Sequence, residues 1–200
     1  MKPRSFAWLS AMVSVGLLSA CSPAPKASWA TPDPKAETVQ DIMKTRIDAA
    51  ADGLWEAVST IDTAEGEEVR RPRTDAEWAG LAEQAQRLID GAMLLEAPRP
   101  ISDPGKDLDD ATTPGARNAA QVRDDIAKDP AAFTTNARRL AAVGRKTLAA
   151  IEARNLTTLL DATAELDAAC ETCHEAFWYP RTAPAKMPSE EALARTENRP

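Results

Sequence analysis

The residues best suited to chemistry lie together near the end of the chain, in the run Cys170-Glu171-Thr172-Cys173-His174. Two thiols at the C-x-x-C-H spacing can each form a thioether bond to a vinyl group of haem. The histidine that follows can then bind the iron as its proximal ligand. His174 is the single histidine among 200 residues, and two of the three cysteines belong to this run. The pattern therefore predicts covalent attachment of one haem c.

Three other uses of this run are weaker. A redox-active dithiol usually opens a helix after a strand, whereas this run lies near the end of a long helical pattern. A structural zinc site needs four ligands, and two cysteines with one histidine leave it one short. A disulfide across a two-residue gap inside a helix would strain the bond geometry. The run therefore favours haem attachment.

Residues 1–20 have the pattern of an export signal. Lys2 and Arg4 precede an apolar stretch over residues 6–18, which is too short for a comfortable membrane span. In bacteria, c-type haem is attached on the outer side of the inner membrane. The signal and the C-x-x-C-H run therefore predict the same compartment, the periplasm.

The run Leu18-Ser19-Ala20-Cys21 resembles the lipobox of bacterial lipoproteins. This resemblance implies cleavage before Cys21 and acylation of its thiol, and it gives a role to a cysteine that would otherwise be a stray thiol in an exported protein. Ordinary signal cleavage near Ala20 is the alternative. Ser22 follows Cys21, where an aspartate would have suggested retention at the inner membrane. The resemblance thus favours a lipid anchor in the outer membrane.

The remaining chain divides into three parts. Residues 21–35 are rich in proline and predict an extended tether, residues 36–180 are enough for one domain, and residues 181–200 predict a disordered tail. The formal net charge is −7 at pH 7, and it becomes more negative when the basic export signal is removed. We therefore expect no binding to nucleic acid.

The body has a helical pattern throughout, with apolar residues three and four positions apart. Thr74 with Glu77 forms a capping box, and Asp129 before Pro130 indicates a second helix start. Long helices are expected over about 36–60, from 74 to Pro98, from 129 to Asn155 and over 157–178, with a short helix over 116–128. Loops are expected around Gly66 and Pro72 and over 98–114.

Four long amphipathic helices joined by loops predict an all-α fold, an antiparallel four-helix bundle. Cys170 and Cys173 lie on the apolar face of the last helix. We therefore expect the haem in the core near one end of the bundle, where burial raises and tunes its potential.

A C-x-x-C-H run at the end of a fourth amphipathic helix resembles the class II c-type cytochromes, the cytochrome c-prime group and its low-spin relatives. The similarity covers roughly 36–180 and rests on residues 170–177 and on Ile42-Met43-Lys44. In the low-spin branch the methionine of a Met-Lys pair is the sixth iron ligand, which implies this role for Met43. The chain departs from the family after Phe177, where Trp178 replaces the usual basic residue.

The position of Met43 along the first helix suits this role. In an up-down-up-down bundle the first helix begins at the end where the fourth one finishes, so Met43 and His174 should lie at similar depth. Met93 near the end of the second helix is the rival, although it lies beside the apolar stripe. A third possibility is that no protein group binds the distal face. Ligation by two histidines is excluded because the chain has one.

The resemblance implies an electron carrier rather than an enzyme, with iron held by histidine and methionine. Such a protein would exchange single electrons with a redox partner protein in the periplasm or membrane. The alternative is a five-coordinate binder of nitric oxide or carbon monoxide, as in the high-spin branch. Weak peroxidase activity would also need an open iron position. Relatives often form homodimers through their first two helices.

Overall fold

A computed structural model describes residues 28–64 and 66–180 of the chain. This part is mostly helical and contains a small two-stranded sheet. The expected export signal, Cys21 and the expected tail over 181–200 lie outside the described residues. No helix within the described part is both long enough and apolar enough to cross a membrane.

The first helical segment consists of α1 (Val39–Ile42), the π-helical η1 (Met43–Asp48) and α2 (Ala49–Glu56), which follow one another without a break. The Thr38 hydroxyl caps its start by accepting the backbone N–H of Asp41 at 3.0 Å. A π-helical turn contains one residue more than an α-helical turn. Residues five positions apart can therefore lie on the same side of this segment.

The π-helical turn changes which residues of this segment are buried. Ile42 and Ile47, five positions apart, are both fully buried, whereas Met43 is only partly buried. A regular period of 3.6 predicts Met43 rather than Ile42 on the buried stripe. The inserted residue therefore shifts the inward face by one position at the start of the segment.

The helix expected over 36–60 ends at Glu56, and a β-hairpin follows it. Strand β1 (Ser59–Thr63) pairs antiparallel with β2 (Gly66–Arg70). Three of the five residues of β1 are β-branched, which favours a strand over a helix. Gly66 has a φ of +127°, a conformation that favours glycine. The all-α expectation is therefore wrong at this point, and the fold is mostly helical with a small sheet.

The later helices agree with the sequence predictions. They are α3 (Asp75–Leu94), α4 (Ala119–Lys128), α5 (Pro130–Glu152) and α6 (Leu156–Phe177). Both hydrogen bonds of the Thr74–Glu77 capping box are present, and Asp129 caps α5 ahead of its first-turn proline. These helix starts are confirmed because each depends on a local motif rather than on long-range packing.

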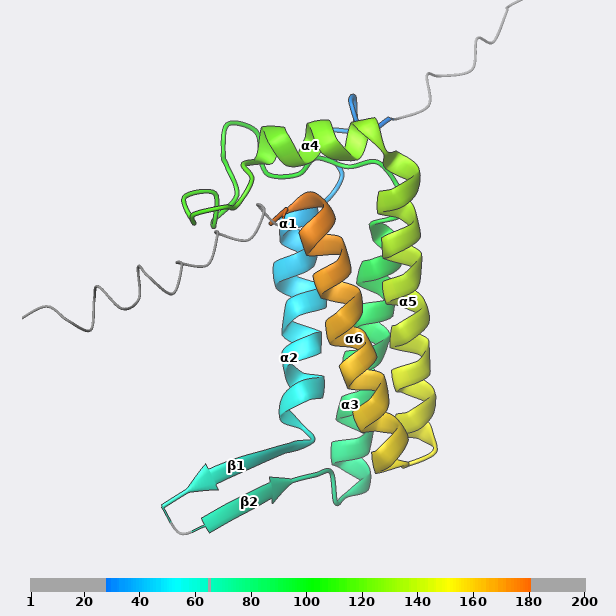
Figure 1. Cartoon of the computed structure of the whole chain (residues 1–200). Coiled ribbons are helices and arrows are strands. Elements are labelled where there is room, and N and C mark those ends of the chain that lie inside the picture. Colours follow the sequence, from blue (N-terminus) through cyan, green and yellow to red (C-terminus); the bar gives the residue numbers. More distant parts are fainter. Residues whose placement is uncertain (1–27, 65, 181–200) are drawn as a thin grey trace, which may run out of the picture.

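The long helices lie side by side, with α3 against α5, α5 against α6, and α2 against α3 (Figure 1). Helix α4 lies across the end where α1 begins and α6 finishes, and the hairpin projects from the opposite end. Gly144 allows α5 to approach α3 closely, since a Cβ atom there would lie 2.8 Å from Leu88.

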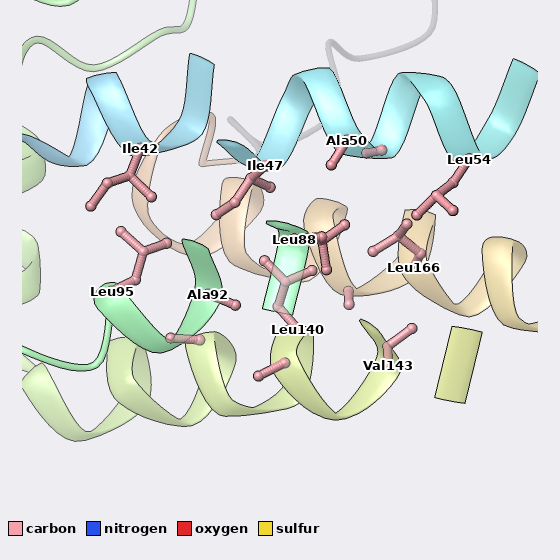
Figure 2. Close-up of a cluster of buried hydrophobic side chains, with 14 of the residues drawn as sticks. Ile42, Ile47, Ala50, Leu54, Leu88, Ala92, Leu95, Leu140, Val143 and Leu166 are labelled. Atoms are coloured by element: carbon pink, nitrogen blue, oxygen red, sulfur yellow. The ribbon is translucent and has the colours of Figure 1, made fainter. Parts of the chain in front are cut away.

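The core fills the space between these helices with aliphatic side chains. Figure 2 shows side chains of all four long segments meeting there, among them Ile47, Leu54, Leu88, Leu140 and Leu166. Each of these five is no more than 7% exposed. The expected stripe of α3 is buried along its whole length: Trp78, Leu81, Ala85, Leu88, Ala92 and Leu95.

Trp29 lies within the segment expected to be an extended tether, yet it is only 5% exposed. Its ring packs edge-on against Phe133 at a centroid distance of 4.9 Å, and Phe133 packs in the same way against Phe177 at 5.3 Å. Such aromatic pairs stabilise a fold beyond the burial of their area. The folded body therefore includes at least one residue of the expected tether.

We expect Trp29→Ala to lower the free energy of unfolding by about 3 kcal/mol, since it removes a large buried ring and leaves a cavity against Phe133. Urea denaturation followed by circular dichroism measures this change. Trp29→Phe is the matched control, because it keeps an aromatic ring and should cost less than half as much. A cost below about 0.5 kcal/mol for Trp29→Ala, the range typical of surface substitutions, would show that Trp29 does not pack in solution.

Candidate functional site

A cavity of about 280 Å³ opens between η1, α5 and the end of α6. Its wall includes Met43 from η1, Leu140 from α5, and Cys170, Cys173 and His174 from α6. The volume is near the lower end of the range for small-molecule sites, roughly 300–1,000 Å³. The structure thus brings Met43 and the C-x-x-C-H run, far apart in the sequence, to the same cavity.

The two cysteines of the run are half-buried free thiols. Burial raises the pKa of Cys170 to about 11, and the negative charge of Asp48 adds to the effect. Burial also raises the pKa of Cys173 to about 12, with a smaller contribution from Cys170. Dithiol redox enzymes instead need a thiol whose pKa is lowered. These surroundings therefore disfavour the dithiol interpretation of the run.

The end of α6 holds His174 in place through the residues that follow it. The His174 carbonyl accepts the backbone N–H groups of Trp178 at 2.8 Å and Tyr179 at 2.7 Å. The Trp178 carbonyl accepts the backbone N–H of Arg117 at 3.0 Å, and the Tyr179 hydroxyl donates to the carboxylate of Asp110. The loop before α4 therefore fixes the helix end that carries the histidine.

The residues that depart from the family pattern lie against the histidine. The ring centroids of Trp178 and Tyr179 lie 6.4 and 6.2 Å from that of His174. Both residues also line the cavity. An aromatic surface therefore stands where the resemblance would place a basic residue.

A second set of contacts holds the same loop to the first helical segment at the edge of the cavity. Lys44 pairs with the carboxylate of Asp109, and the Gln40 side chain accepts the backbone N–H of Asp109 at 2.8 Å. The hydrogen bond to Asp109 raises the pKa of Lys44, and the charge of Asp109 adds to it. Both partners are exposed, so the ion pair orients the loop more than it stabilises the fold.

Asp48 is a cavity residue that the sequence pattern did not single out. It lies five positions after Met43 at the other end of η1, and both residues line the cavity. Asp48 is exposed as a whole residue, but packing at the cavity raises the pKa of its carboxyl group. The nearby His174 opposes this rise, and the charge of Asp52 adds to it. A π-helical turn does not follow the 3.6-residue period of an α-helix, so this period does not predict that Asp48 faces the cavity.

Met93, the rival for the distal position, lies elsewhere. Its side chain is on α3 and is 54% exposed, and it is not part of the cavity wall. Met43 is the other methionine within the described part of the chain, and it does line the cavity. The geometry therefore supports Met43 over Met93 as the residue available to a group bound there.

The donor set fits haem better than a bare metal ion. Two neighbouring thiols and one imidazole face a cavity whose other walls include Leu140, Phe133 and Trp178. Apolar walls of this kind suit a porphyrin, and the thiols can form its thioether bonds. Among the described residues, no group of three or more histidine, cysteine, aspartate or glutamate side chains is arranged to hold a metal ion.

No protein-family model matches the chain, and the searches of curated proteins and of solved structures found no match either. The resemblance to the class II c-type cytochromes therefore remains a prediction from the sequence.

Proposed function

We propose that this protein is an exported c-type cytochrome that carries single electrons through one covalently bound haem. The observation that carries the proposal is the shared cavity of Met43, Cys170, Cys173 and His174. These residues supply two thiols for attachment and two candidate axial ligands on one site. Since the two ligands come from different helices, their meeting is a property of the fold and not of the motif alone.

Each residue has a distinct role in the proposal. Cys170 and Cys173 would hold the haem through thioether bonds, and His174 and Met43 would bind its iron. A haem with both axial positions filled supplies one-electron chemistry and leaves no open position for a substrate. The contacts of Trp178 and Tyr179 with the loop before α4 fix the end of α6 that carries His174.

We further infer that α1–η1–α2, α3, α5 and α6 form an antiparallel four-helix bundle. The contacts of α3 with α5, of α5 with α6 and of α2 with both α3 and α6 support this arrangement. The first segment begins at the end where α6 finishes (Figure 1), as an up-down-up-down order requires.

Export and anchoring are also part of the proposal. The basic and apolar pattern of residues 1–20 and the lipobox-like run ending at Cys21 support acylation in the periplasm, with the outer membrane favoured. The expected partner is a redox protein in the periplasm or at the membrane.

The absorption spectrum of the purified protein tests the proposal. We expect a low-spin ferric spectrum with the weak long-wavelength band of methionine–iron bonding, and no change when carbon monoxide is added to the reduced protein. A high-spin spectrum that shifts with carbon monoxide would contradict the electron-carrier proposal and favour a gas-binding protein. Absence of haem would contradict both.

A further inference from the structure

The proposed electron-transfer function gives no role to the β-hairpin. It projects from the end of the molecule opposite the start of α1 and the end of α6 (Figure 1), and residues at that other end line the cavity. Within the described residues, β1 and β2 pair only with each other. All five residues of β2 are exposed. A two-stranded hairpin is only marginally stable in water, and its free edges can pair with another strand.

The pairing register of β1 and β2 shows which backbone N–H and C=O groups of β2 are free to bond to another strand. Two residues separate Thr63 from Gly66, the pair that closes the hairpin, and in such a hairpin the closing pair exchanges backbone hydrogen bonds. Along the strands, hydrogen-bonded pairs then alternate with pairs that are not hydrogen-bonded. Every second residue of β2, beginning with Gly66, therefore turns its backbone groups toward β1. The N–H and C=O groups of Glu67 and Val69 therefore point to the free edge. Strand β2 ends at Arg70, and the same alternation carried one residue further assigns Arg71 to that edge as part of our inference.

The charges along this edge are self-complementary. The run Glu67-Glu68-Val69-Arg70-Arg71 has two acids, an apolar residue and two bases. When two copies lie antiparallel with Val69 opposite Val69, each Glu68 lies opposite an Arg70, and each Glu67 lies opposite an Arg71. Four opposite-charge pairs then flank one apolar pair, an arrangement that stabilises neighbouring strands.

Other registers are disfavoured by the same charges. A shift of the two-fold axis by one residue places Glu68 opposite Glu68 or Arg70 opposite Arg70, and parallel pairing in register also sets like charges together. Like charges directly opposite one another destabilise a sheet. The backbone hydrogen-bonding pattern agrees with the favoured register. In that register, the free N–H and C=O groups of Glu67, Val69 and Arg71 of one copy lie opposite those of the other copy.

We propose that the free edge of β2 pairs with the same edge of a second copy, giving a two-fold symmetric homodimer with a four-stranded antiparallel sheet. Val69, 53% exposed in the monomer, becomes covered at the centre of this interface. Arg70, which lies 3.7 Å from Glu68 of its own strand, gains a partner across the axis. The surface is independent of the cavity, so the proposal does not rest on the proposed function.

Sedimentation analysis of the purified protein tests the proposal, using double variants that exchange the charges along this edge. We expect the wild type to dimerise more weakly as salt increases, since the charge pairs are exposed. The double variants Glu67→Arg/Glu68→Arg and Arg70→Glu/Arg71→Glu should each raise the dissociation constant at least tenfold. An equimolar mixture of the two should restore a dimer, because the opposite edges then complement each other.

Val69→Pro provides a second test that does not depend on charge. Proline lacks the N–H that residue 69 would donate to the second copy, so the dimer should be lost. Residue 69 donates no hydrogen bond to β1, so the hairpin itself should be retained. The absorption spectrum of each variant should be unchanged, because the hairpin lies far from the cavity. A wild type that stays monomeric at all concentrations would overturn the proposal. So would a dimer that persists in every variant, which would indicate pairing through another surface such as the first two helices.

Discussion

Met43→Ala is expected to convert the purified protein from a low-spin to a high-spin state and to make the reduced form bind carbon monoxide. The thioether of Met43 lines the same cavity as His174, and alanine cannot reach the iron from that position. The long-wavelength ferric band should disappear completely, and carbon monoxide should shift the absorption of the reduced variant. A half-buried methionine also packs against the core, so a loss of about 1–2 kcal/mol in unfolding free energy should accompany the change.

Met93→Ala is the matched control for this experiment. It makes the same chemical change on α3 at a side chain that is 54% exposed and lies off the cavity. We expect its spectrum to match the wild type and its unfolding free energy to change by less than about 0.5 kcal/mol. A low-spin spectrum in Met43→Ala would rule out Met43 as the distal ligand. Loss of that spectrum in Met93→Ala would move the assignment to Met93.

The double variant Cys170→Ser/Cys173→Ser is expected to contain no covalently bound haem. A hydroxyl group does not replace the thiol in the thioether bonds, while serine differs from cysteine by one atom and disturbs the helix little. Haem staining after denaturing electrophoresis should be lost, and the mass of the intact chain should lack the added haem. Each single variant should retain haem through one bond, with its absorption bands shifted to longer wavelength because one vinyl group remains conjugated.

Cys21→Ser is the matched control for the cysteine variants, because it changes the third cysteine, which precedes the folded body. It should keep covalent haem and lose incorporation of labelled palmitate. Retention of covalent haem in the double variant would contradict the attachment site. Palmitate labelling that survives in Cys21→Ser would contradict only the proposed lipid anchor, so the two parts of the proposal are tested separately.

The features predicted correctly from the sequence depend on short stretches of chain. The Thr74–Glu77 capping box and the Asp129–Pro130 pair mark helix starts through contacts within one turn. The apolar stripe of α3 follows a regular period, and its residues are buried as expected. The spacing of Cys170, Cys173 and His174 likewise places them together on α6 without any tertiary information.

The features missed depend on tertiary packing or on irregular backbone. The π-helical η1 breaks the 3.6 period, and this brings Asp48 to the cavity and buries Ile42 in place of Met43. Where the hairpin forms, the sequence predicts a helix end and a loop, because the two strands are short and carry charges instead of a buried apolar face. Trp29 follows several prolines, so only its contact with Phe133 reveals that it is part of the core.

The burial of Trp29 limits how far the body can stand from a lipid attached at Cys21. Eight residue steps separate the two positions, and an extended chain covers at most about 3.5 Å per step, so the reach is about 28 Å. Trp29 packs against Phe133, a cavity residue, so the cavity end would be tethered nearest the bilayer. Electrons would then pass most readily to proteins in the same membrane.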